Sequence, residues 1–249
     1  MNTRRFFTLA KTEMKLSLRS FDMILFGILM PLVIVFVIGL VYGGEGNGLE
    51  PGVLARSFGA YISIGICAVG LMGMPLTLAD YRHKKVLKRL SVTPAHPGLL
   101  LGVQLFVQGL VAILSALLVT LAGVLFFGYQ LAGSLGVTVL AYFIVLFSIF
   151  SLGMIIASLA PDIKKAGLLC SVVYFPMLLF SGTTIPFHLF PRWLQNIAEV
   201  LPLSQGILLL NGISLGEPLA AHWGRIFLLL AMTVGLVAIS IKTFRWDME

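Results

Sequence analysis

The sequence predicts an all-helical membrane protein with six transmembrane helices. Two observations carry this prediction. Hydrophobic residues make up 59% of the 249 residues and charged residues only 11%, whereas about a quarter of a typical soluble chain is charged. The apolar residues also gather in long charge-free runs, separated by short basic segments. We therefore expect one transmembrane domain over residues 1–249.

Six runs are long enough for transmembrane helices, which need roughly 20 apolar residues to cross the bilayer. The charge-free stretch 90–161 is too long for one crossing and divides at the glycine-containing segment 127–134. The last run is short, so Arg225 and Lys242 are expected to extend from its two ends toward the membrane surfaces. The predicted spans cover residues 23–42, 57–79, 99–126, 135–160, 166–185 and 223–243.

The distribution of Lys and Arg predicts how these spans are oriented. All but three of the 17 basic residues fall in residues 1–22, 80–97, 161–165 and the tail after residue 241. Because two predicted spans separate each of these segments from the next, all four lie on one side of the membrane. Short cytoplasmic loops are enriched in Lys and Arg. Both termini are therefore predicted to be cytoplasmic.

Residues 3–21 predict an amphipathic helix. In a helical projection, an apolar stripe lies beside a basic stripe. The apolar stripe consists of Phe7, Ala10, Met14, Leu18 and Phe21. A helix of this kind lies in the membrane interface, here on the inner leaflet.

Residues 80–90 predict a short cytoplasmic helix between the second and third spans. Asp80 stands at its start, where a carboxylate suits the helix dipole. One face carries His83, Val86, Leu87 and Leu90, and the neighbouring face carries Arg82, Lys85 and Arg89. Two interpretations remain open. The helix docks in the groove of a partner protein, or its charges only orient the spans and meet anionic lipid.

The outer loop 186–222 predicts a helical hairpin before the last span. Pro191 is expected to open a helix whose Trp193, Leu194, Ile197 and Leu201 share one face. Pro202 interrupts this helix, and the apolar run 203–215 that follows is too short to cross the bilayer. We expect a hairpin that is either re-entrant or lies on the outer surface.

Three prolines, Pro31, Pro75 and Pro176, lie inside predicted spans. Each removes a backbone hydrogen bond. They are either static packing kinks or the flexible points of pore helices.

The sequence contains no motif for catalysis or metal binding. No Gly-rich loop ends in Lys-Ser or Lys-Thr, so no phosphate cradle is expected in this chain. The four His residues have no ligand spacing, and Cys67 and Cys170 are expected to be buried small hydrophobic residues. No ionisable residue is predicted deep in a span, which disfavours a proton-driven carrier. Energy for uphill transport would therefore come from a partner.

Two runs of residues, in their order along this topology, are specific enough to suggest a family. The first is Ala79-Asp80-Tyr81-Arg82, followed by Leu87-Lys88-Arg89-Leu90 and Thr93-Pro94. The second is Ser181-Gly182, Ile185-Pro186, Leu189-Phe190-Pro191, Trp193-Leu194 and Leu201-Pro202-Leu203. With these runs the chain resembles the membrane permease subunit of a type-2 ATP-binding-cassette exporter, of the drug- and antibiotic-export kind.

The resemblance implies a complex of two permeases, identical or different, with separate cytoplasmic ATPase subunits that bind ATP and Mg²⁺. ATPase coupling is implied for Asp80, Tyr81, Arg82, Lys85, Val86, Leu87, Lys88, Arg89 and Leu90. Asp162, Lys164 and Lys165 either form a second ATPase contact or serve only the topology. An outer gate is implied at Pro186, Phe190, Trp193 and Leu201.

The resemblance also implies a substrate path along the second and fifth spans, at Leu71, Met74, Phe175 and Phe180. Gln104 and Gln108 in the third span either face the substrate or form an interhelical hydrogen bond. The expected cargo is an amphiphilic drug, antibiotic or lipid-like molecule, exported across the cytoplasmic membrane of a prokaryote. The alternatives are export of a lipid-linked polysaccharide, a stand-alone channel or gradient-driven carrier, and a membrane protein of assembly or sensing.

Overall fold

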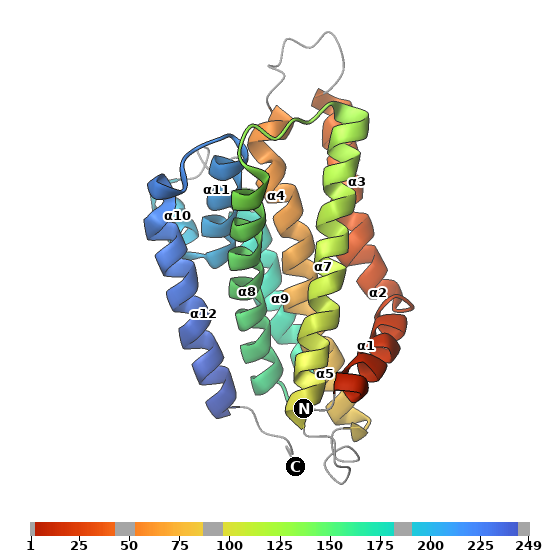
Figure 1. Ribbon diagram of the computed structural model, residues 1–249. Coiled ribbons are helices and arrows are strands. Elements are labelled where there is room, and N and C mark those ends of the chain that lie inside the picture. Colours follow the sequence, from red (N-terminus) through yellow and green to blue (C-terminus); the bar gives the residue numbers. More distant parts are fainter. Residues whose placement is uncertain (1–2, 43–52, 87–96, 182–190, 244–249) are drawn as a thin grey trace.

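The computed structural model describes residues 3–42, 53–86, 97–181 and 191–243. Within these residues the chain is helical apart from turns and short links, and no strand occurs among them. The long helices run side by side in an elongated bundle (Figure 1). The predicted all-helical fold is confirmed.

The first half of the bundle contains two helices interrupted by π-helical segments, followed by the long helix α7. Its elements are α1 (Thr3–Ser17), α2 (Phe21–Ile24), η1 (Leu25–Leu29), α3 (Met30–Tyr42), α4 (Val53–Cys67), η2 (Ala68–Gly73), α5 (Met74–His83) and α7 (Pro97–Phe127). The second half consists of α8 (Leu135–Leu159), α9 (Ile163–Phe180), α10 (Arg192–Val200), α11 (Pro202–Ser214), η4 (Leu219–His222) and α12 (Trp223–Thr243).

Five helices are long and apolar enough to cross a membrane. They cover Arg56–His83, Leu99–Phe127, Leu135–Leu159, Ile163–Phe180 and Leu219–Thr243. These helices correspond to the second to sixth predicted spans. The first predicted span, residues 23–42, corresponds to the shorter apolar helix Leu25–Val41.

The basic segments described by the structure gather at one end of the bundle. This end holds α1, the last turn of α5, the turn between α8 and α9, and the end of α12 (Figure 1). Ala79, Ala160 and Ala166 pack together there and join α5 to the α8–α9 turn. We call it the basic end. The opposite end carries the link between α7 and α8 and the pair α10 and α11 (Figure 1).

The second span, built from α4, η2 and α5, is the most buried of the five long helices. Its side chains Ile66, Val69, Leu71 and Met74 are fully buried. It packs against α3, α7, α8, α9 and α11. Cys67 in this span and Cys170 in α9 are buried and form no disulfide with each other, so their prediction as buried small residues is confirmed.

The α10–α11 pair follows the break that the prolines predict. The α10 helix ends before Leu201, which has an extended backbone, and α11 starts at Pro202. Leu203, Leu209 and Ile213 of α11 are buried. The side-chain oxygen of Asn211 accepts a hydrogen bond from the backbone N–H of Gly59 in α4, at 2.7 Å. The α11 helix is therefore packed into the bundle, and the position of the hairpin relative to the membrane, re-entrant or surface-lying, stays a prediction.

The N-terminal helix differs from its prediction in length and in the face that it buries. It ends at Ser17, and the chain turns before α2. Ala10 and the neighbouring Phe6 pack on Val103 and Val107 of α7, while Phe7, from the predicted apolar stripe, is 60% exposed. The prediction is wrong in length, because the helix ends at Ser17. Part of the predicted stripe packs on α7 through Ala10 and Met14, and its place in the membrane interface stays a prediction.

Two of the three span prolines follow a π-helical segment. Pro31 comes two residues after η1, and Pro75 two residues after η2. A proline lacks the N–H and its ring crowds the carbonyl four residues back. A wide π turn at that place relieves the crowding. Pro176 lies within α9, which shows no such segment.

A close backbone contact joins the second span to α8. A methyl group on Gly153 would lie 2.1 Å from the carbonyl oxygen of Gly70, far inside van der Waals contact. Only glycine at position 153 allows α8 to approach η2 this closely.

We predict that Gly153→Ala lowers the free energy of unfolding by about 1–3 kcal/mol, because the added methyl group overpacks the interface. Thermal unfolding in detergent micelles measures this change. Gly109→Ala in α7 is the matched control, because a methyl group there meets nothing within 4 Å and alanine is the better helix former. Equal unfolding temperatures for the two variants would contradict the close contact.

Candidate functional site

The last turn of the second span lies at the basic end and starts the predicted coupling segment. The α5 helix continues through Asp80 and ends at His83. Lys84 and Lys85 form a turn in which Lys85 has a φ of 54°, in the left-handed region that commonly ends helices. The prediction of one helix from Asp80 to Leu90 is therefore wrong at its start.

Two exposed lysines mark this turn. Lys84 reaches back to Asp80, with its ammonium nitrogen 2.7 Å from a carboxylate oxygen. Lys85 is also exposed, and Val86 is partly buried. The other predicted coupling residues, Leu87, Lys88, Arg89 and Leu90, lie outside the described residues.

Arg82 turns inward and bonds to the end of α8. Its Nη1 donates to the backbone carbonyl oxygen of Ala160 at 2.7 Å and to that of Ala157. The last carbonyl groups of a helix have no partner within the helix, and a cation stabilises that end of the helix dipole. Arg82, which the sequence pattern put on a partner-facing side, thus joins the second span to α8.

Tyr81 belongs to a buried polar cluster that the sequence did not predict. Its hydroxyl donates to Glu13 Oε2 of α1 at 2.5 Å, and Gln104 Nε2 of α7 donates to the same oxygen at 2.7 Å. Glu13 is only 7% exposed. A buried carboxylate is stable only when it is paired or hydrogen-bonded, as it is here. The cluster therefore joins α1, α5 and α7.

Gln104 accordingly forms an interhelical hydrogen bond, one of the two roles considered for it.

The sequence contained one signal that Glu13 is buried. Glu13 follows the buried Ala10 by three residues and so lies on the same helix face. Glu13 and Gln104 could have been paired only with knowledge that α1 packs on α7.

The predicted second ATPase contact lies beside the last turn of α5. Asp162 caps α9, because its Oδ1 accepts a hydrogen bond from the backbone N–H of Lys165 at 2.8 Å. Lys164 and Lys165 are exposed. Because Ala79 and Ala166 pack together, the last turns of α5 and the start of α9 lie side by side at the basic end.

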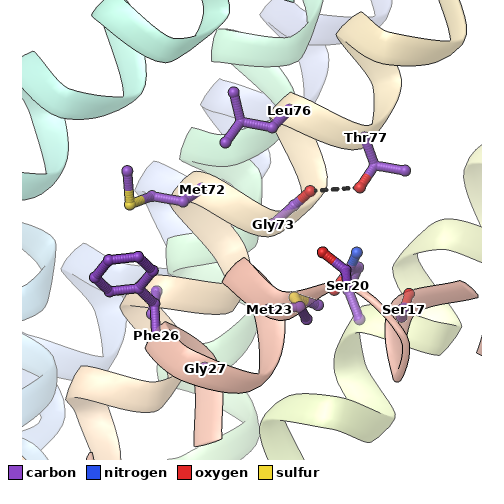
Figure 2. A pocket seen from close by; sticks show the side chains of 11 residues that line it. Ser17, Ser20, Met23, Phe26, Gly27, Met72, Gly73, Leu76 and Thr77 are labelled. Carbon is purple, nitrogen blue, oxygen red and sulfur yellow. Dashed lines mark hydrogen bonds between the residues drawn. The ribbon is translucent and has the colours of Figure 1, made fainter. Parts of the chain in front are cut away.

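A cavity of about 270 Å³ lies between the N-terminal segment and the second span. One wall comes from residues 17–27, and the other from residues 68–77. Gln108 of α7 also lines it. Figure 2 shows Phe26 and Met72 on one side of the cavity and Ser17, Ser20 and Thr77 on the other. The cavity is thus apolar on one side and polar on the other.

The other predicted path residues are not gathered at one surface. Leu71 and Met74 are buried in the core, and Phe175 on α9 is 55% exposed. Phe180 is partly buried near the end of α9. Of the six predicted path residues, Gln108 lines the cavity; a role for the other five in the substrate path stays a prediction.

The predicted outer gate falls mostly outside the described residues. Pro186 and Phe190 lie outside the described residues, and Trp193 belongs to α10 but its side chain is not described. Leu201 is partly buried and links α10 to α11. Nearby, the buried His222 lies 2.9 Å from Glu217 and 2.6 Å from Arg225. Arg225, predicted to extend from the end of the last span, thus lies at the start of α12 and contacts η4.

No group of three or more His, Cys, Asp or Glu side chains gathers within the described residues. The side chains gathered at the basic end bond to helices of the same chain or carry exposed positive charge. Such an arrangement can transmit a displacement and attract an acidic partner.

Comparison with known proteins identifies the family. A family model described as ABC-2 type transporter matches residues 4–214. The chain is 25% identical over 201 residues to the inner membrane transport permease YhhJ of Escherichia coli, covering 79% of this chain and 53% of that protein. It is 26% identical over 182 residues to the probable multidrug ABC transporter permease YbhR of Escherichia coli, covering 72% and 50%.

A shorter match, 39% identical over 70 residues, is to the nodulation protein J of Rhizobium leguminosarum, and covers 28% of this chain and 27% of that protein. The chain spans about half the length of the two Escherichia coli permeases. The family match covers most of the chain, and its apolar helices are those of a multi-pass membrane protein. The chain therefore belongs to the ABC-2 type transporter family of membrane transport permeases.

Proposed function

We propose that the chain is the membrane subunit of an ATP-driven exporter of amphiphilic molecules, working with separate ATPase subunits. One observation carries the proposal most strongly. The exposed cationic turn Lys84–Lys85 follows directly on a helix turn that is bonded to three other helices through Tyr81 and Arg82. A partner that moves this turn would move α1, α7 and α8 together.

The proposed exporter crosses the membrane six times, with the helix Leu25–Val41 as the first crossing. At 1.5 Å per residue, a 17-residue apolar helix is about 26 Å long, slightly less than the roughly 30 Å of the hydrocarbon core. The preceding residues of α2 and local thinning of the bilayer can supply the difference. The positive-inside rule supports a cytoplasmic basic end, in the inner membrane of a prokaryote.

In the proposed mechanism, the ATPase subunits bind ATP and Mg²⁺ and close beneath the basic end. The displacement passes from the Lys84–Lys85 turn and the segment after it into α5. Arg82 then carries it to α8, and the Tyr81–Glu13–Gln104 cluster carries it to α1 and α7. A second permease subunit completes the path, which opens outward past residues 186–201.

An amphiphilic cargo matches the lining of the cavity between the N-terminal segment and the second span. The cavity at the basic half is apolar on one side and polar on the other. The printed name of the relative YbhR, a probable multidrug permease, supports the same class of cargo. A molecule with an apolar body and a polar head fits both observations.

We predict that an ATPase subunit co-purifies with the tagged chain at near-equal stoichiometry after gentle extraction from its native host. Reversing three charges, Lys85→Glu, Lys88→Glu and Arg89→Glu, lowers its recovery about tenfold, or about 1.4 kcal/mol, because opposite charges steer and fix the contact. Arg82 is left intact because it bonds to α8. Protein mass spectrometry measures the recovery.

Arg192→Glu, an exposed charge reversal in α10 at the opposite end, is the matched control and keeps full recovery. Topology is checked in the same samples with Gln130→Cys, an exposed position in the α7–α8 link, and a membrane-impermeant thiol reagent. The coupling role would be overturned if no ATPase is recovered with the wild type. It would also be overturned if the triple charge reversal changes only the access of the reagent to the cysteine introduced at position 130. Transport by the chain alone in liposomes would then indicate a stand-alone carrier.

A second prediction concerns the buried cluster. Tyr81→Phe removes the hydroxyl that donates to Glu13, so it lowers the free energy of unfolding by about 1.5–3 kcal/mol, the range for a hydrogen bond to a charged group. It also weakens the coupling of ATP hydrolysis to transport. Thermal unfolding and the ratio of transport to hydrolysis measure the two effects.

Tyr142→Phe is the matched control for this change. The Tyr142 hydroxyl is buried and has no hydrogen-bond partner within the described residues, so its removal leaves both stability and coupling unchanged. If Tyr81→Phe behaves like Tyr142→Phe, the cluster does not hold α1 to α5.

A further inference from the structure

The cavity between the N-terminal segment and the second span has the features of a binding site. Its volume of about 270 Å³ is close to the lower limit of small-molecule sites. A head group and the first carbons of a tail fit this space, while a longer tail would continue into the lipid. Both walls include π-helical turns, η1 on one side and η2 on the other, a feature frequent at functional sites.

The polar side of the cavity offers hydrogen-bond acceptors. Gln108 is only 1% exposed, and its Oε1 accepts no hydrogen bond from any described residue. Buried polar atoms in proteins nearly always have a partner. Thr77 donates its hydroxyl hydrogen to the carbonyl oxygen of Gly73 at 2.7 Å, which leaves its own oxygen free to accept. A ligand head group with two donor hydrogens, such as an –NH₂ group, would donate one hydrogen to each acceptor.

Gly73 keeps the space beside this amide open. A methyl group at Gly73 would lie 3.0 Å from the Met23 sulfur and 3.3 Å from Gln108 Oε1, tighter than ordinary contact. The glycine therefore leaves room beside the buried Gln108 oxygen, which a side chain at this position would crowd.

The charge of the site restricts its ligand. None of the described residues that line the cavity is an Asp, Glu, Lys, Arg or His. An ionised head group would therefore lose its hydration without a charged partner, which is costly in an apolar surrounding. A neutral head group has no such cost.

We propose that this cavity binds the neutral head of an amphiphile that carries an N–H or O–H donor. The donor bonds to Gln108 Oε1, a second donor hydrogen on the head group bonds to the Thr77 hydroxyl oxygen, and the first part of the tail lies against Phe26 and Met72. The assignment of this amphiphile as cargo rests on the proposed export function, whereas its binding does not depend on an ATPase.

The test uses the full chain in lipid nanodiscs and three photoreactive probes with the same twelve-carbon tail. The probes are a primary amide, its methyl ester and the corresponding primary ammonium. We expect the amide to label the protein with the highest affinity, because only the amide combines a donor with a neutral head. Gln108→Leu weakens amide binding about three- to tenfold, the range for one hydrogen bond, and leaves ester binding unchanged.

Two further variants locate the site. Met72→Trp fills the cavity and abolishes competable labelling by the amide. Thr120→Val is the control, because the Thr120 hydroxyl bonds to the carbonyl oxygen of Ala116 within α7, about three turns away from Gln108. This variant is expected to bind the amide probe with wild-type affinity. Size-exclusion chromatography confirms that each variant is folded before it is compared.

Four results would overturn the proposal: equal affinity for amide and ester, tightest binding of the ammonium, no effect of Gln108→Leu, or no effect of Met72→Trp. The export function is tested separately in the purified complex with its ATPase. If the amide binds as expected but neither stimulates ATP hydrolysis nor is transported, the cavity is confirmed as a binding site and the amphiphile is rejected as cargo.

Discussion

The arrangement of the described bundle depends on the burial of its second span. This helix packs against α3, α7, α8, α9 and α11, and its approach to α8 is limited by backbone contact between Gly70 and Gly153. Without a hydrophobic driving force between helices in lipid, close packing at small residues holds transmembrane helices together. A displacement of this span would therefore also displace the helices packed against it.

The polar groups at the basic end complete this constraint. Glu13 and Arg82 are ionisable groups placed against helices, and each is bonded within the bundle, Glu13 to Tyr81 and Gln104 and Arg82 to carbonyl groups of α8. A buried charge that lost its partner would be strongly unfavourable. These bonds therefore keep α1 and α8 attached to α5, so that the N-terminal helix is part of the bundle.

The all-helical membrane fold and the division of the chain into apolar and basic segments could be predicted from the sequence. The approximate bounds of five spans and the gathering of basic segments follow from hydropathy and from the Lys and Arg bias. Pro191 correctly marked the start of α10, and Pro202 the start of α11. The errors arose where tertiary contacts decide. The buried face of α1 and the inward direction of Arg82 each depend on a neighbouring helix. A helical projection treats each helix alone and cannot include that neighbour.

The proposed coupling and the proposed binding site meet in a single helix. The α5 helix runs without a break from η2, which lines the cavity, to the turn that carries Lys84 and Lys85. From Gly73 to His83 the helix rises about 15 Å. Pro75 removes a backbone hydrogen bond near the junction with η2. Under the proposed function, force applied at the basic end would bend the span at the cavity wall. Met72 and Gly73 would then move relative to Gln108 on α7, and that movement would change the fit of the bound head group.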